Sequence, residues 1–264
     1  MTATETGARL VRSERSGAVA VLTLDRPQAR NALSVELMGE LEQSLGAVAA
    51  DRSVKAVILG STGPAFCSGH DLKEMRACRD RDVYQDLFAQ CSRLMLAIVR
   101  LPQPVIARVQ GIATAAGCQL VASCDLAVAA ESARFATPGV NIGLFCSTPM
   151  VALSRNVSRK HAMEMLLTGE MVSAADALRL GLVNRVVPDA DLDSAARALA
   201  DTIASKSGHV VRLGKEAFYR QLEMGLEDAY AFASRVMTEN MMARDAEEGI
   251  GAFLEKRQPA WREE

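Results

Sequence analysis

The clearest indication of the fold is the segment Pro104-Val-Ile-Ala-Arg-Val-Gln-Gly111-Ile-Ala-Thr-Ala-Ala116-Gly117-Cys-Gln119-Leu120. It begins with a short β-branched apolar run, which is typical of a buried strand. After the glycine the side chains become small, so we expect a helix over residues 116–123, and another strand over residues 126–130. Strands separated by helices in this way indicate an α/β core in which most strands are parallel.

The same alternation extends outward from this stretch. Ser34 is the expected N-cap of a helix that reaches about residue 50. After Pro149 the pattern becomes almost wholly helical. We therefore predict a core over residues 1–200 and a C-terminal helical subdomain over residues 201–264. The other expected elements are strands at residues 19–24 and 54–59 and helices at residues 82–100, 174–180, 192–206 and 214–244.

Composition argues against several classes of function. The chain has 30 basic and 32 acidic residues, so it has no excess of positive charge that would favour binding to nucleic acid or an anionic membrane. Its longest uncharged run, residues 109–124, is too short to span a bilayer, and its first residues lack the apolar core of a signal peptide. Six cysteines and three histidines show no metal-ligand spacing, so we expect no metal and reduced thiols. Reduced thiols favour a cytoplasmic location.

Two segments place glycine and small residues where a strand meets a helix. They are Pro64-Ala-Phe-Cys-Ser-Gly69-His70-Asp-Leu-Lys73-Glu and Gln110-Gly111-Ile-Ala-Thr-Ala-Ala116-Gly117-Cys-Gln119-Leu. The first amides of a helix have no partner within it and point outward, so such a junction suits an oxyanion. Small side chains also let a ligand approach the backbone closely. Taken singly, each segment is better explained by a turn followed by a tightly packed helix.

The order of such blocks resembles the crotonase (enoyl-CoA hydratase/isomerase) superfamily over essentially the full length of the chain. This resemblance implies an α/β crotonase fold with a repeated ββα spiral core, a C-terminal helical trimerisation region, and homotrimers or hexamers. The matching blocks are Asp25-Arg-Pro-Gln-Ala-Arg-Asn31-Ala-Leu33, Ala65-Phe-Cys-Ser-Gly-His-Asp-Leu-Lys-Glu74, Pro104-Val-Ile-Ala-Arg-Val-Gln-Gly111, Gly117-Cys-Gln-Leu, Cys124-Asp125-Leu-Ala, Leu167-Thr-Gly169 and Gly249-Ile-Gly-Ala-Phe-Leu-Glu-Lys-Arg257.

The resemblance also implies a site for an acyl-CoA thioester. In the family two backbone amides hold the thioester oxygen, and by position these belong to His70 and Ala116. Negative charge collects on that oxygen in an enolate, where each preorganised donor is worth roughly 3–4 kcal/mol of barrier. Coenzyme A would enter as part of the substrate, with no tightly bound cofactor. Its expected contacts are Ala29, Arg30, Ser68, Asp71, Leu72 and Lys73, with Lys256 reaching the phosphates either within one chain or across a subunit boundary.

The sequence departs from the family pattern at both acid/base positions. Family hydratases use two glutamates, and here Gln119 and Gly139 stand in their places. Glutamine orients a water by hydrogen bonding but exchanges no proton near neutral pH, and glycine does neither. Because general acid–base help is worth about 10²–10⁴-fold per group, we expect no efficient hydration by two glutamates.

Other groups nearby offer alternatives. Cys146 and Ser147 lie in the segment that lines the acyl pocket of relatives, and Cys146 would be a nucleophile if His70 or a helix terminus lowered its pKa. The opposing interpretation is a buried, inert cysteine. His70 itself would be a general base, unless it faces solvent. The missing glutamates, together with residues 137–149, resemble the subgroup of enoyl-CoA hydratase domain-containing proteins.

Three functions remain open on the sequence. The first is an enzyme of fatty-acid and acyl-CoA metabolism that stabilises a thioester enolate without two-carboxylate chemistry. The second is a non-catalytic oligomer that binds acyl-CoA or has a regulatory role. The third is an ordinary 2-enoyl-CoA hydratase.

Overall fold

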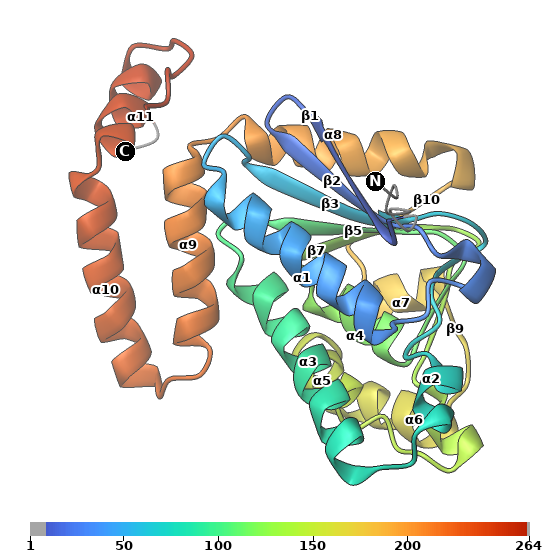
Figure 1. Ribbon diagram of the computed structural model, residues 1–264. Coiled ribbons are helices and arrows are strands. Elements are labelled where there is room, and N and C mark those ends of the chain that lie inside the picture. The colour runs from blue at the N-terminus through green and yellow to red at the C-terminus, as the bar shows by residue number, and fades with distance from the viewer. Residues whose placement is uncertain (1–8, 263–264) are drawn as a thin grey trace, which may run out of the picture.

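The larger of two sheets forms the centre of the molecule in the computed structural model, which describes residues 9–262 (Figure 1). Its strand order is β1-β2-β3-β5-β7-β10. Only β1 runs antiparallel, so the prediction of an α/β core with mainly parallel strands is confirmed. The strands are β1 (Val11–Ser16), β2 (Val19–Leu24), β3 (Ala56–Ser61), β5 (Val105–Val109), β7 (Leu126–Ala130) and β10 (Arg185–Val187).

A second, smaller sheet has the order β4-β6-β8-β9. Each of the pairs β3–β4, β5–β6 and β7–β8 gives one strand to each sheet before the chain enters a helix. This is a repeated ββα spiral, although the sequence itself shows no repeat. The strands are β4 (Ala65–Cys67), β6 (Ile112–Thr114), β8 (Arg134–Ala136) and β9 (Val172–Ser173).

Helices cover both faces of the large sheet. On one face the main core lies between the sheet and α1 (Val35–Ala50), α3 (Arg81–Arg100) and α4 (Ala116–Ser123). On the other face α8 (Leu192–Ala204) lies along the strands, as Figure 1 shows, and packs Leu192, Ala196 and Ala200 onto them. The remaining helices of the core are η1 (Pro27–Ala29), α2 (Leu72–Ala77), η2 (Pro138–Ile142), α5 (Pro149–Asn156), α6 (Arg159–Thr168), α7 (Ala174–Leu180) and η3 (Asp189–Asp191).

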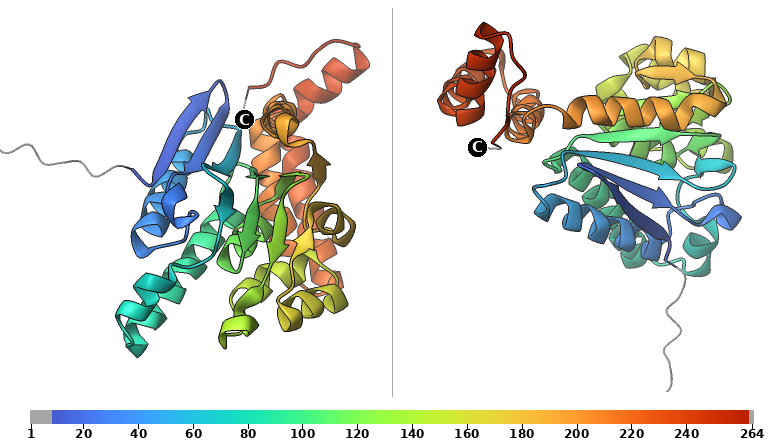
Figure 2. Two further views of the ribbon diagram at one scale, coloured as in Figure 1. Left: turned by 90° about the vertical axis from the view of Figure 1, so that its right-hand side faces the viewer. Right: turned by 90° about the horizontal axis from the view of Figure 1, so that it is seen from above.

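Three C-terminal helices stand to one side of this core (Figures 1 and 2). They are α9 (Gly208–Gln221), α10 (Leu226–Met242) and α11 (Arg244–Leu254). The prediction of one helix over residues 214–244 is wrong, because the chain turns back at Gly225, which is the N-cap of α10. Two short strands, β9 and β10, also interrupt the almost wholly helical pattern expected after Pro149, because strands of two and three residues leave no periodic signal.

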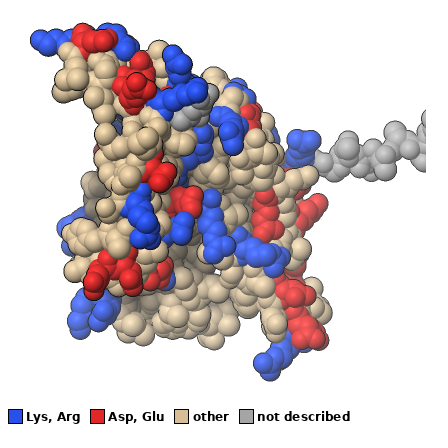
Figure 3. All heavy atoms as spheres, turned by 90° about the vertical axis from the view of Figure 1, so that its left-hand side faces the viewer, with Lys and Arg blue, Asp and Glu red and all other residues tan. Residues whose placement is uncertain are grey.

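Exposed apolar side chains gather on these three helices. Phe253, Met242, Leu226 and Tyr230 are each more than 70% exposed. Figure 3 views the side on which α10 and α11 lie, where acidic and basic side chains are interspersed among broad neutral areas. A monomeric protein rarely exposes so many large apolar side chains together.

Two buried polar clusters fix how the elements meet. Asn31 is fully buried with a φ of 52°, and its Nδ2 donates 2.8 Å hydrogen bonds to the carbonyls of Thr62 and Ala65. Beside it, the Arg26 guanidinium donates to the Asp71 carboxylate at 2.7 Å. Asp71 also caps α2 through the Lys73 amide. Together these contacts hold the end of β2 against the end of β4.

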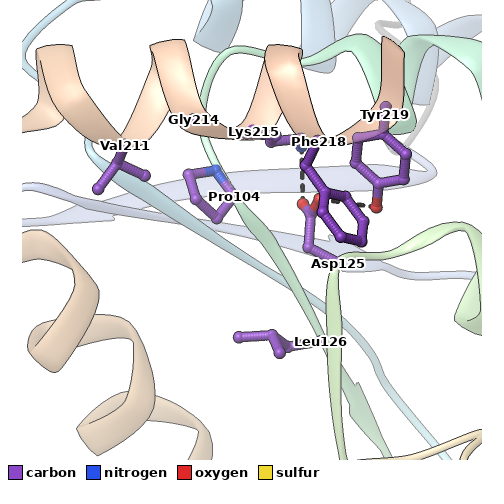
Figure 4. Close-up of a pocket in the computed structure, with 8 residues that line it drawn as sticks. All are labelled: Pro104, Asp125, Leu126, Val211, Gly214, Lys215, Phe218 and Tyr219. Carbon is purple, nitrogen blue, oxygen red and sulfur yellow. Dashed lines mark hydrogen bonds and ion pairs between the residues drawn. The ribbon is translucent and has the colours of Figure 1, made fainter. Parts of the chain in front are cut away.

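The second cluster attaches α9 to the core (Figure 4). Asp125, between α4 and β7, accepts hydrogen bonds from the Val105 amide at 2.6 Å, Lys215 Nζ at 2.7 Å and the Tyr219 hydroxyl at 3.0 Å. Lys215 Nζ also donates to the carbonyls of Ile98 and Gln103. Asp125 therefore organises the turn after α4 and in addition anchors the C-terminal helices.

We predict that Lys215→Met lowers the free energy of unfolding by about 3–5 kcal/mol, because it leaves the buried Asp125 carboxylate without its cation. The Lys215 and Asp125 side chains are only 7% and 14% exposed. Arg179→Met is the control, since it removes an exposed ion pair with Asp176, worth about 0–1 kcal/mol. Urea denaturation of both variants measures the difference. Equal losses in the two variants would contradict the anchoring role of Lys215.

Candidate functional site

The candidate site lies where β4 and β6 end. These strands pair in parallel, with Cys67 opposite Ala113, so their carboxyl ends lie side by side. The Thr114 hydroxyl donates to the Ser68 carbonyl at 3.1 Å just beyond the strands. Gly69 has a φ of 99°, and a Cβ on it would lie 2.9 Å from Ala115 Cβ and 3.4 Å from the Ala116 nitrogen. The backbone around Gly69 therefore touches the start of α4, and only glycine fits.

The two amides predicted as oxyanion donors both lie at this junction. In the bridge between Leu33 and His70, the amides that donate are those of Leu33 and Asp71, which leaves the His70 amide unused. Ala116 is the first residue of α4, preceded by Ala115 in an unusual conformation (φ 51°, ψ −119°). Among residues 9–262, neither the His70 amide nor the Ala116 amide finds a hydrogen-bond acceptor.

The His70 side chain does not face solvent, contrary to one of the two expectations from the sequence. Its ring packs edge-on against Phe88 of α3, with 5.5 Å between ring centroids. Burial lowers the pKa of His70 to about 4, so the imidazole is neutral near neutral pH. Its Nε2 atom is buried without a hydrogen-bond partner. A neutral imidazole supplies no positive charge to stabilise a neighbouring thiolate.

Positions 119 and 139, where the family pattern leads us to expect glutamates, differ in the space around them. Gln119 is a buried residue of α4 whose Oε1 atom has no hydrogen-bond partner. Gly139 lies in η2, where a Cβ would come 2.9 Å from the Leu144 carbonyl oxygen and 3.0 Å from Cys146 Sγ. A glutamate therefore fits at position 119 without rearrangement, whereas at position 139 the following loop would have to move.

Cys146 fills the space beside Gly139. Its side chain is 7% exposed, and burial raises the pKa of the thiol despite a backbone hydrogen bond with Gly139. These surroundings are those of a packing cysteine, since a reactive one needs a lowered pKa. Ser147 is exposed, and its hydroxyl donates to the Phe145 carbonyl at 3.4 Å.

The residues expected to contact coenzyme A fall in two places. Arg30, with a φ of 52°, lies beside Ser68, whose amide donates to the Arg30 carbonyl at 3.1 Å. Lys256 lies instead at the end of α11, far from α2 in the views of Figures 1 and 2. The structure therefore groups most of the set but separates Lys256 from it within one chain. The grouped residues are Ala29, Arg30, Ser68, Asp71, Leu72 and Lys73.

Sequence reasoning did not single out Thr137 or Phe88. Thr137 is fully buried directly before Pro138, and its hydroxyl has no hydrogen-bond partner. The signal available for Thr137 was its place in the segment beside Gly139. Phe88 had none, because its contact with His70 joins two distant elements.

Residues 9–262 contain no group of three metal-ligand side chains and no helix long and apolar enough to cross a bilayer. A cavity of about 360 Å³ is lined by Asp125, Lys215, Phe218 and neighbours (Figure 4). It lies beyond the carboxyl end of α4, away from the amide at its start, so it is distinct from the candidate site.

Comparison with known proteins matches residues 14–264 to the enoyl-CoA hydratase/isomerase family. The rat enoyl-CoA hydratase domain-containing protein 3, mitochondrial, is 48% identical over 97% of this chain and 86% of its own. The crystal structure of the human protein of that name has a TM-score of 0.93 at 48% identity, covering 96% of this chain and 100% of that one. An enoyl-CoA hydratase structure from Mycobacterium smegmatis has a TM-score of 0.95 at 58% identity, covering 96% and 99%.

These relatives correct one prediction and confirm another. The prediction of a cytoplasmic location is wrong, because the rat relative and its human counterpart are named as mitochondrial proteins. Reduced thiols exclude an oxidising compartment but do not distinguish one reducing compartment from another. The resemblance of residues 137–149 to the enoyl-CoA hydratase domain-containing subgroup, its third paralogue in particular, agrees with these names. The chain belongs to the enoyl-CoA hydratase/isomerase family.

Proposed function

We propose that the chain binds an acyl-CoA thioester and places the thioester oxygen between the amides of His70 and Ala116. The observation that carries this proposal is that both amides lie unpaired at the adjacent ends of two parallel strands. Buried amides are almost always hydrogen-bonded, so a pair left free at one junction calls for an external acceptor. An enolate oxygen is such an acceptor, and its charge makes each bond stronger.

The reaction is proposed to differ from two-glutamate hydration. Near the amides the chain offers Gln119, a neutral His70 and a neutral Cys146, and position 139 has no side chain. None of these groups resembles a carboxylate that takes a proton from water at neutral pH. Stabilisation of an enolate in acyl-CoA metabolism remains the first candidate. A non-catalytic acyl-CoA-binding oligomer is the second, and the closed space beside Gly139 favours it.

The binding role is tested by replacing the Ala116 amide with an ester, through incorporation of lactic acid at that position. Because the ester lacks the N–H donor, we expect the affinity for butyryl-CoA to fall about fivefold or more. Titration calorimetry measures the dissociation constant. The same replacement at Ala47, within α1, is the control and should leave the affinity unchanged. An unchanged affinity in the Ala116 ester would rule out this amide as a contact.

The proposed lack of an acid/base carboxylate is tested with Gln119→Glu, which introduces one carboxylate in a side chain of the same shape. We expect the variant to hydrate crotonyl-CoA about 10²-fold faster than the parent, since one general acid–base group is worth that much or more. The loss of enoyl-thioester absorbance measures the rate. Gln43→Glu on the exposed side of α1 is the matched control. A parent that already hydrates crotonyl-CoA as fast as the variant would instead establish the ordinary hydratase.

We propose in addition that copies of the chain associate through the exposed apolar side chains of α10 and α11. Met242 is 79% exposed and Phe253 is 83% exposed, which is unusual for large apolar groups in a stable monomer. Association would also allow Lys256 of one copy to approach the site of another.

We predict that the double variant Met242→Glu, Phe253→Glu sediments as a smaller species than the parent, because each carboxylate would be buried without a partner in the interface. Analytical ultracentrifugation gives the molar mass. Leu167→Glu is the control, since Leu167 is 60% exposed on α6, outside the C-terminal helices. Identical molar masses for the parent and the double variant would remove these helices as the contact.

A further inference from the structure

Ala115, the residue between β6 and α4, has a backbone conformation that normally belongs to glycine. Its φ of 51° and ψ of −119° are close to those of the first central residue of a type II′ turn, about +60° and −120°. Glycine dominates that position because a Cβ there crowds the neighbouring backbone. Ala115 is therefore strained, and such strain persists only where the surrounding structure holds it in place.

The strain follows from the length of the connection that Ala115 forms. β6 ends at Thr114 and α4 begins at Ala116, so a single residue makes the whole change from strand to helix. Connections between a strand and a helix usually contain about two to six residues, which share the change of direction among several pairs of dihedral angles. Here one pair absorbs all of it.

Both backbone groups of Ala115 are held by other residues. Its amide donates to the Ala136 carbonyl at 2.9 Å, which extends the parallel pairing of β6 with β8 by one residue. Its carbonyl accepts the Gln119 amide at 3.0 Å, which is the first hydrogen bond of α4. The sheet fixes one end of the residue and the helix fixes the other, so Ala115 relaxes only if one of these bonds breaks.

The conformation of Ala115 decides where the Ala116 amide points. The peptide that joins the two residues is trans, so its carbonyl and its N–H point in opposite directions. Because the carbonyl points into α4, the N–H points away from the helix. The turn that carries His70 comes close to the same nitrogen, since a Cβ on Gly69 would lie 3.4 Å from it.

We propose that Ala115 is a positioning residue, whose strained conformation directs the Ala116 amide toward the thioester oxygen. This inference rests on the proposed function and adds how the orientation of one of the two donors is maintained. A relaxed Ala115, with a negative φ, would rotate the peptide that joins it to Ala116 and turn the N–H aside. Since protein groups alone fix Ala115, the donor is oriented before a ligand binds, as preorganised stabilisation requires.

The strain is tested by Ala115→Gly. Glycine adopts this conformation without a steric penalty, so the urea midpoint of unfolding should rise, although glycine also increases the freedom of the unfolded chain. Ala47→Gly, in the regular helix α1, is the matched control, and its midpoint should fall. A fall of similar size in both variants would overturn the proposal, because it would show that Ala115 is not strained.

The positioning role is tested with two esters at position 115, both of which lack the N–H that bonds to Ala136. Lactic acid keeps the methyl group and therefore the strain, whereas glycolic acid has neither. Titration calorimetry compares butyryl-CoA with S-butyl-CoA, a thioether without the carbonyl oxygen. We expect the parent to prefer the thioester about tenfold or more. The lactic acid protein should lose most of this preference, because its strained segment relaxes, and the glycolic acid protein should keep it.

The preference for the thioester reports the orientation of the amide, since a purely structural defect would weaken the binding of both ligands equally. Lactic acid at Ala47 is the control and should leave the preference unchanged. If both esters at position 115 keep the preference, or both lose it, Ala115 is not the positioning residue while acyl-CoA binding stands. If the parent shows no preference, the proposed function itself fails, whatever the stability of Ala115→Gly.

A side-chain series gives the same test should the lactic acid protein fail to fold. Ala115→Val keeps the N–H but increases the strain, because a β-branched side chain is the least compatible with this conformation. The preference for the thioester should fall in Ala115→Val and persist in Ala115→Gly. Equal preferences in these two variants would overturn the proposal.

Discussion

The rest of the site depends on the parallel pairing of β4 and β6. Because the two strands end at the same edge of the small sheet, the turn after one touches the helix that follows the other. Gly69 makes that approach possible, since a Cβ there would meet Ala115. The position of the His70 and Ala116 amides is thus a property of the backbone, set by sheet register. Side chains at these positions can change while the donors stay in place, which explains how an imidazole is accommodated at His70 by packing against Phe88.

The sequence predicted the elements that have a clear local pattern and missed those that do not. The Ser34 cap, the helix over residues 116–123 and the strand over residues 126–130 follow from local pattern, and each lies where expected. The short strands β4, β6 and β8 have three residues each, too few for a periodic signal, so the second sheet could not be predicted from pattern alone. The break at Gly225 was missed because helical apolar spacing continues across it.

Within the site, the types of residue were easier to predict than the surroundings of their side chains. The sequence showed that Gln119 and Gly139 lack carboxylates, but not that their surroundings differ. The conformation of the loop after η2 decides that difference, because it brings the Leu144 carbonyl and the Cys146 thiol against Gly139. Among the described residues, by contrast, Gln119 Oε1 has no hydrogen-bond partner. Likewise the pKa of His70 is lowered by burial that depends on α3, and no local pattern reports such packing. Thr137 became noticeable only when its hydroxyl was found to be buried and unpaired.

Positions 119 and 139 differ in what a carboxylate would need in order to fit there. At position 119 the amide has the same shape as a carboxylate, so a glutamate would fit the surroundings of Gln119. At position 139 the loop has closed onto the glycine, and Cys146 occupies space that a longer side chain would need. A glutamate at position 119 needs no other change in the chain. A longer side chain at position 139 needs a different packing of the segment after η2. A buried amide and hydroxyl without partners are costly to keep unless something binds them. Gln119 and Thr137 keep such unpaired atoms close to the backbone contact between Ala136 and Ala115, next to the two amides proposed to hold the thioester oxygen.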